Sequence, residues 1–177
     1  LDVPTYYGVD WGTVHPMGII EVKYYDGALY IDELNYLSEN QIKERLKPNE
    51  KQLIAQDDQG IIKWLFSRLN IPKESPVICD NNRTANITAL RKMGYSMAMA
   101  AKKGKGSILS GIALLNSIDV YYTETSKNMD KEVKNYSRKV DRYGIILEDP
   151  EDDYNHLCDP GRYVAEYLQS KGIIKAR

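Results

Sequence analysis

The chain has 177 residues, with 24 Lys and Arg against 25 Asp and Glu, which gives a formal net charge of −1. This length suits one domain with its own hydrophobic core, and the sequence contains no run of about 18 apolar residues that could cross a membrane. No basic and apolar leader opens the chain, so we expect a protein that is not secreted. Its two cysteines are too few for a disulfide framework.

The near-zero net charge hides segments of opposite charge. Residues 81–118 contain six basic residues and no acid, whereas residues 148–161 contain six acids and no Lys or Arg. Nucleic-acid binding depends on local basic surface, so a neutral total does not exclude it. A second basic stretch, residues 127–142, is diluted by acids that include Glu132, and there we expect a solvated helix face. The chain begins at Leu1, and we expect it to be a piece of a longer protein.

The first third of the chain predicts three antiparallel strands. Apolar or weakly alternating runs lie at residues 6–10, 17–25 and 28–34. Asp26-Gly27, between the last two runs, is a strong signal for a tight hairpin. Strands so closely linked are expected to be neighbours in one sheet.

Beyond Tyr36 the hydrophobic pattern becomes that of helices alternating with short strands. We predict strands at residues 76–79, 95–101 and 119–122, helices at 52–69, 84–93, 107–117 and 128–139, and a last helix containing Tyr163 and Leu168. Helices between strands favour parallel pairing, with helices on both faces of the sheet. The prediction is therefore an α/β domain with a mixed sheet, in which an antiparallel three-strand meander is followed by parallel strands.

Two acids come where predicted strands end, which is where sites gather in sheets of this class. Asp10 ends the first strand, and Asp80 ends the apolar run that precedes it. A third acid, Asp159, follows His156 by three residues, so the two side chains share one face if that segment is helical.

Acids gathered from distant parts of a chain repel one another, and a hard cation commonly resolves that repulsion. Oxygen ligands suit Mg²⁺ or Mn²⁺. Two such ions about 3.5–4 Å apart can clamp the attacking and leaving oxygens of phosphodiester hydrolysis. Composition and periodicity do not by themselves select these three residues from the 25 acids, because a lone Asp at a strand end is more often a turn or cap residue.

Four segments, in a fixed order, carry a resemblance to a known family. They are Tyr7-Gly8-Val9-Asp10-Trp11-Gly12 with His15-Pro16, Val77-Ile78-Cys79-Asp80, Ala101-Lys102-Lys103-Gly104-Lys105-Gly106-Ser107-Ile108 with Gly111-Ile112, and Asp153-Tyr154-Asn155-His156-Leu157-Cys158-Asp159 with Arg162-Tyr163. In this order they resemble the nuclease domain of phage terminase large subunits, which has a ribonuclease H-like fold. The match spans nearly the whole chain, and its last segment is the most specific.

The resemblance implies a metal-dependent endonuclease that cuts double-stranded viral DNA, with little sequence preference, during genome packaging. Asp10, Asp80 and Asp159 would hold two Mg²⁺ or Mn²⁺ ions, with Asp10 as the bridging ligand. His156 would be a further ligand or a proton-transfer group, which completes the implied catalytic set. Glu33 lies where cellular ribonucleases H carry a further acid, although many strands simply end with a solvated Glu.

The resemblance also implies a DNA contact at Lys102, Lys103 and Lys105, where a basic turn and the amides of a following helix can meet a phosphate. Arg83 is the next candidate for this role. The chain has no Walker motif, so the ATPase motor would lie outside residues 1–177, which would form a single nuclease domain. The implied partners are DNA, that motor domain, the small terminase subunit and the portal, in the host cell cytoplasm.

Two positions depart from the family pattern. After Asp80 the chain reads Asn81-Asn82-Arg83-Thr84, so we expect no role for an acid just past Asp80. Pro160 stands where the family has a small helix former. The last helix is therefore expected either to begin with Asp159 as its N-cap, or to begin near Asn155 and be disturbed at Pro160.

Other interpretations stay open on the sequence. A junction resolvase or transposase core of the same fold would keep the acids and act on branched or transposon-end DNA. Asp10-Trp11-Gly12-Thr13 echoes the phosphate turn of actin-like and sugar-kinase-like ATP binders, although those proteins need two such domains. A DNA-clamping module without catalysis is the third alternative.

Overall fold

The computed structural model of the chain describes residues 3–102, 104, 106–136, 138–140, 146–150 and 154–175. Lys103 and Lys105 of the predicted basic turn, and much of the acidic segment 148–153, lie outside these residues. None of the helices in the described part of the chain is long and apolar enough to span a membrane.

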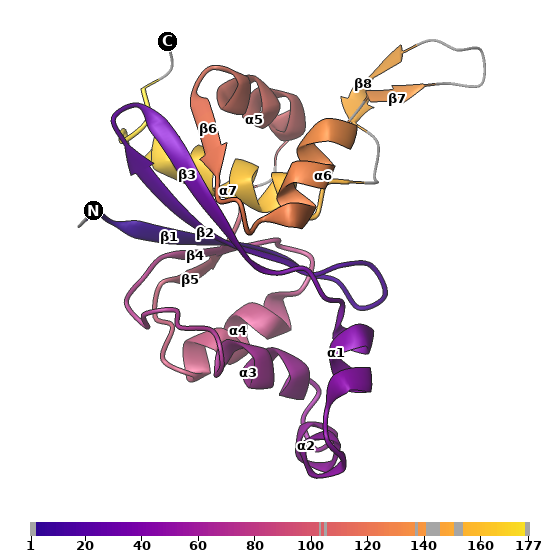
Figure 1. Cartoon of the computed structure of the whole chain (residues 1–177). Helices are drawn as coiled ribbons and strands as arrows, with labels where there is room; N and C mark the ends of the chain where they lie inside the picture. The colour runs from indigo at the N-terminus through magenta and orange to yellow at the C-terminus, as the bar shows by residue number, and fades with distance from the viewer. Residues whose placement is uncertain are drawn as a thin grey trace.

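Six strands form one mixed sheet in the order β5-β4-β1-β2-β3-β6 (Figure 1). The central meander β1-β2-β3 is antiparallel, whereas β4 pairs parallel to β1, β5 parallel to β4, and β6 parallel to β3. The strands are β1 (Thr5–Asp10), β2 (Gly18–Tyr25), β3 (Ala28–Asn35), β4 (Val77–Cys79), β5 (Ala98–Ala100) and β6 (Asp119–Tyr122). The predicted meander followed by parallel strands is confirmed.

The hairpin between β2 and β3 turns at the predicted pair. Asp26 and Gly27 have φ values of 49° and 80°, the left-handed conformation that a two-residue hairpin turn requires at both central positions. Tyr25 consequently pairs with Ala28, directly across the turn.

The helices lie on both faces of the sheet (Figure 1). Alternation along β1 explains the two cores, because Tyr7 and Val9 pack into one and Tyr6 into the other. The first face carries α1 (Glu39–Arg45), α2 (Pro48–Ile54), α3 (Gly60–Phe66) and α4 (Thr84–Lys92). The second face carries α5 (Ser107–Asn116), α6 (Lys127–Asn135) and α7 (Cys158–Ser170).

The single helix predicted over residues 52–69 is wrong, because this region forms α2 and α3 with a turn between them. The Asp57 carboxylate accepts a hydrogen bond from the Gln59 backbone N–H at 2.9 Å and so stabilises the turn. The chain folds back tightly here: a Cβ on Gly60 would lie 2.2 Å from the Ile54 carbonyl oxygen. The helical spacing of the apolar residues reflects two short helices that share one core.

The helix predicted over residues 128–139 also ends early. α6 stops at Asn135, and Tyr136 is already extended, with φ −64° and ψ 111°. A second, two-stranded sheet follows, in which β7 (Arg138–Val140) pairs antiparallel with β8 (Ile146–Pro150). Pairing with β8 competes with the helix, and the local apolar pattern does not show this partner.

Candidate functional site

Asp10 and Asp80 lie at the same edge of the sheet. Asp10 is the last residue of β1, and Asp80 directly follows the neighbouring parallel strand β4. The Asp80 backbone N–H donates to the Val9 carbonyl oxygen at 2.8 Å, and the Trp11 indole N–H donates to the Asp80 carbonyl oxygen at 2.9 Å. These contacts fix the backbone on which both carboxylates are mounted.

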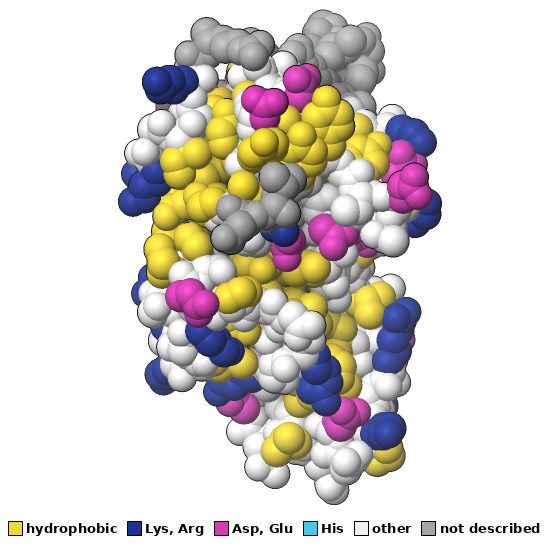
Figure 2. All heavy atoms as spheres, turned by 60° about the vertical axis from the view of Figure 1, so that its left-hand side comes forward, with side chains coloured by type: hydrophobic (Ala, Val, Ile, Leu, Met, Phe, Trp, Pro, Cys, Tyr) yellow, Lys and Arg dark blue, Asp and Glu magenta, His cyan; other side chains and the backbone are white. Residues whose placement is uncertain are grey.

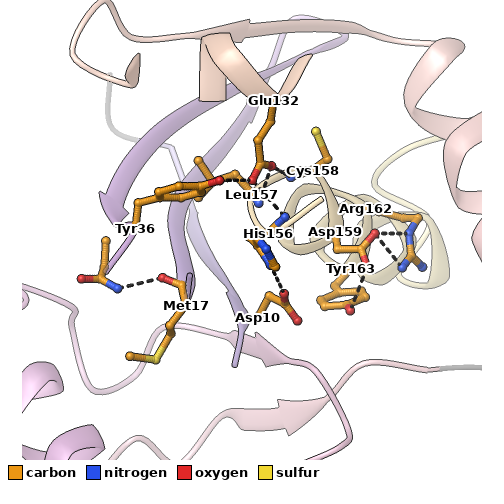
Figure 3. Close-up of polar contacts among 11 residues, drawn as sticks. Asp10, Met17, Tyr36, Glu132, His156, Leu157, Cys158, Asp159, Arg162 and Tyr163 are labelled. Atoms are coloured by element: carbon orange, nitrogen blue, oxygen red, sulfur yellow. Dashed lines mark hydrogen bonds and ion pairs between the residues drawn. The ribbon is translucent and has the colours of Figure 1, made fainter. Parts of the chain in front are cut away.

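Asp159 reaches this edge from the start of α7, where it is the second helical residue. Its Oδ1 accepts a hydrogen bond from the Arg162 Nε–H at 3.3 Å, and its Oδ2 accepts one from the Tyr163 hydroxyl at 3.4 Å (Figure 3). α7 can lie this close to β1 because Gly8 has no side chain: a Cβ there would be 2.6 Å from the Pro160 carbonyl oxygen.

Both expectations for the start of the last helix are corrected by the structure. α7 begins at Cys158, so Asp159 is not its N-cap, and the helix runs through Pro160 without a break. Pro160 is the third helical residue, and the N–H groups of the first turn have no partner within a helix in any case. The Asp159 carboxylate is therefore not taken up in capping its own helix.

His156 lies in the turn before α7, and its Nδ1 is 3.3 Å from Asp10 Oδ2 (Figure 3). Gly18, the first residue of β2, lets this turn approach the sheet, because a Cβ there would lie 1.7 Å from the His156 carbonyl oxygen. The His15 ring stacks on the His156 ring with their centroids 6.0 Å apart. Asp10 and His156, both predicted for the site, are thus in direct contact.

The charged groups at the site shift the pKa values of Asp10 and His156. Burial raises the pKa of Asp10 above its ordinary value, the charges of Asp80 and Asp159 raise it further, and the hydrogen bond with His156 opposes this. Burial lowers the pKa of His156, but its hydrogen bond with Asp10 and the nearby acidic charges together outweigh that effect, so the pKa lies above its ordinary value. Three carboxylates from distant parts of the chain therefore share one negative field, which a bound cation would relieve.

The donor set fits Mg²⁺ or Mn²⁺ in its chemistry, since hard carboxylate oxygens and an imidazole are suitable ligands. It is not drawn together as a closed cage: among the described residues, no group of three or more His, Cys, Asp or Glu side chains is arranged to hold a metal ion. The structure thus shows an acidic site with suitable donors, in which Asp10 and His156 are in direct contact.

Of the predicted DNA-binding residues, the structure describes Lys102 and Arg83. Lys102 is exposed in the loop before α5. Arg83 directly precedes α4, where its guanidinium forms an ion pair with Glu39 at 2.7 Å and also bonds to the Thr13 hydroxyl. On the face shown in Figure 2, Lys and Arg side chains of the described residues are scattered among acids and do not gather in one stripe. Arg83 therefore braces the loop after β1.

Two acids make contacts that were not foreseen from the sequence. The Glu33 carboxylate accepts hydrogen bonds from the backbone N–H groups of Asn128 and Met129, so it caps α6. Glu132, which we expected on a solvated helix face, is fully buried. Its spacing of three from the buried Met129 was the one available signal, because residues three apart share a helix face.

The chain is similar in sequence to a terminase large subunit. No family model matches the chain. In sequence it is 29% identical, over 112 residues, to the large subunit of the terminase of Bacillus phage SPP1; these residues are 62% of this chain and 26% of that protein. The match thus spans about a quarter of the length of the relative.

Solved structures give the more extensive match. The nuclease domain of the SPP1 large terminase, with bound Mn, aligns with a TM-score of 0.66 and 22% identity over 93% of this chain and 86% of that one. The fold of the present chain is therefore that of terminase nuclease domains. The large terminase of a thermophilic bacteriophage aligns with a TM-score of 0.62 and 20% identity, over 96% of this chain and 41% of that one.

The resemblance to terminase nuclease domains that four sequence segments predicted is confirmed. So is the ribonuclease H-like class of the fold, with its antiparallel meander flanked by parallel strands. Within this terminase nuclease fold, Asp10, Asp80 and Asp159 lie where two strands end and α7 begins.

Proposed function

We propose that this chain is the nuclease domain of a phage-type terminase and cleaves double-stranded viral DNA during genome packaging. The observation that carries the proposal is the contact of Asp10 with His156, beside the charges of Asp80 and Asp159, in a chain that has the fold of terminase nuclease domains. By similarity to the terminase large subunits, the proposed partners are DNA, an ATPase motor domain outside this chain, the small subunit and the portal. The proposed location is the host cell cytoplasm.

The proposed cofactor is Mg²⁺ or Mn²⁺, with two ions held by Asp10, Asp80 and Asp159 and with His156 as a further ligand or a proton-transfer group. The Mn bound in the SPP1 nuclease domain supports this choice. When bound, such ions make water a better nucleophile and stabilise charge on the leaving oxygen of a phosphodiester.

The chain's own residues would orient the ligands. The two backbone contacts to Asp80 hold it against β1, and the 3.3 Å contact with His156 limits the rotation of the Asp10 carboxylate. The Arg162 side chain, itself only 3% exposed, fixes Asp159 through a second contact of 3.1 Å, from its Nη2 to Asp159 Oδ1. Such prior positioning lowers the entropy cost of binding metal and DNA.

The decisive experiment is plasmid cleavage in Mg²⁺ or Mn²⁺ by the wild-type chain and by Asp10→Asn. We expect cleavage that requires the metal, and we expect Asp10→Asn to reduce its rate by about two orders of magnitude or more. Asp26→Asn is the matched control. It makes the same chemical change in the exposed hairpin turn, where Asn tolerates the left-handed φ of 49°, and it should cleave normally.

Undiminished cleavage by Asp10→Asn would contradict the proposal. A linear duplex and a four-way junction are compared in the same assay, since preferential nicking of the junction would instead favour a resolvase. DNA binding without cleavage at millimolar metal would favour a clamping module.

A further inference from the structure

We propose that Glu132 is a positioning residue for the site, acting through the turn that carries His156 and the helix that carries Asp159. The inference rests on the proposed function, which it deepens by naming what holds two of the site residues in place. Glu132 lies in α6 and has an exposed fraction of 0%.

Both oxygens of the Glu132 carboxylate accept hydrogen bonds (Figure 3). Its Oε1 accepts from the Tyr36 hydroxyl at 2.8 Å and from the His156 backbone N–H at 3.0 Å. Its Oε2 accepts from the backbone N–H groups of Leu157 at 2.7 Å and Cys158 at 3.1 Å. A carboxylate offers about four lone-pair sites, so these donors leave little capacity for a metal ion. Glu132 therefore acts through its neighbours.

These contacts replace a cap that α7 otherwise lacks. The first N–H groups of a helix have no partner within it, and Leu157, at the N-cap position, makes no side-chain capping bond. Glu132 supplies the acceptor from a different helix, with its negative charge at the positive end of α7. The same carboxylate thus holds both the turn before α7 and its first residue.

His156 and Asp159 both lie at or next to backbone groups that Glu132 binds. The His156 backbone N–H donates a hydrogen bond to Glu132, and the His156 ring contacts Asp10. Asp159 follows Cys158 directly and faces Arg162 and Tyr163. A shift of the turn would therefore move the imidazole and the carboxylate together.

α6 is anchored to the sheet in turn, which fixes where Glu132 lies. Glu33 of β3 accepts hydrogen bonds from the backbone N–H of Asn128 at 3.0 Å and of Met129 at 3.2 Å. The Ser126 hydroxyl accepts a bond from the Glu33 backbone N–H at 2.9 Å. The Glu33 carboxylate thus connects β3 to α6, and the Glu132 carboxylate connects α6 to the start of α7.

The test is Glu132→Gln, because the amide keeps the size of the side chain but turns a donor toward other donors. Mn²⁺ affinity is measured from the free Mn²⁺ signal in electron paramagnetic resonance, alongside circular dichroism and thermal melting. We expect the fold to persist and the Kd for Mn²⁺ to rise by about 10- to 100-fold, as for loss of other groups that orient metal ligands. We also expect saturating Mn²⁺ to recover much of the lost cleavage rate.

Ile62→Val is the control for a merely structural effect, because Ile62 is buried in α3 on the opposite face of the sheet. This variant should melt earlier and bind Mn²⁺ like the wild type. Tyr36→Phe removes one donor to Glu132 and keeps the ring, so it should weaken Mn²⁺ binding in the same direction by a smaller factor. It serves as the test if Glu132→Gln does not fold.

Wild-type Mn²⁺ affinity in a folded Glu132→Gln, or in Tyr36→Phe if the former does not fold, overturns the inference and leaves the proposed function intact. A wild-type chain that neither binds Mn²⁺ nor cleaves DNA overturns both. Equal losses of Mn²⁺ affinity in Glu132→Gln and Ile62→Val would also overturn the inference, because a general loss of stability would then explain the effect.

Discussion

Gly18 sets how closely the turn that carries His156 can approach the sheet. A Cβ at this position would lie 1.7 Å from the His156 carbonyl oxygen, so even a methyl group must displace the turn. The residue is needed for this approach and not for an unusual backbone conformation, because it has no positive φ.

Gly18→Ala is therefore expected to reduce cleavage by about 100-fold, since a misplacement near 1 Å can cost that much. Plasmid cleavage and Mn²⁺ titration measure the loss, and circular dichroism checks the fold. Gly27→Asn is the control, because Gly27 has φ +80° with no atom within 4 Å, and Asn tolerates that conformation. Unchanged cleavage by Gly18→Ala would show that the position of the His156 turn does not matter.

Helix ends decide which acids of this chain remain at the site. Glu33 and Glu132 carry carboxylates as Asp10 does, yet both accept hydrogen bonds from backbone N–H groups at helix N-termini. The sequence predicted neither role, because each donor comes from a segment distant from the acid along the chain. The strand-end acids could be predicted, since parallel strands bring their carboxyl ends to one edge.

The turn between α2 and α3 gives a test in which two effects have opposite signs. Ala is the better helix former, by about 1 kcal/mol over Gly, so propensity predicts that Gly60→Ala stabilises the protein. A Cβ there would lie 2.2 Å from the Ile54 carbonyl oxygen, however, and overpacking costs about 1–3 kcal/mol.

We expect the close contact to prevail, so Gly60→Ala should lower the free energy of unfolding by about 1 kcal/mol or more. Urea denaturation followed by circular dichroism measures the change. A gain in stability would mean that the turn relaxes at low cost and that residues 52–69 are close to forming one helix.

At the scale of the whole molecule, the near-neutral total charge hides segments of opposite charge along the chain. The formal charge is −1, although residues 81–118 are purely basic among their charged groups. A domain of this kind is expected to bind DNA weakly and with a strong dependence on salt, because phosphate contacts release counterions.

Replacing Lys102, Lys103 and Lys105 by Ala should reduce the slope of log K against log salt by about one per lysine lost. Fluorescence anisotropy with duplex DNA, in EDTA to prevent cleavage, measures the slope. Replacing Lys43, Lys47 and Lys51 by Ala makes the same change in net charge at exposed positions in and beside α1 and α2. An equal change in slope for the two variants would contradict a specific basic turn.

The sequence by itself determined the six strands of the mixed sheet, the Asp26-Gly27 hairpin and the order of acids that resembles terminase nuclease domains. These features depend on local periodicity, on backbone preferences at single residues and on motifs that can be read along the chain. The break before Gly60 and the end of α6 at Asn135 became visible only in the structure. Local contacts of Asp57 and Ile54 form the first, pairing of β7 with β8 competes with the second, and the helical spacing of apolar residues records neither.

The tertiary structure also decided which acids serve as caps and which remain at the site. Glu132 is held by the N–H groups of residues 156–158, and Asp10 is left beside His156. The physical reason is that a buried carboxylate must find hydrogen-bond donors. The donors of a helix N-terminus become available to it only once the chain has folded.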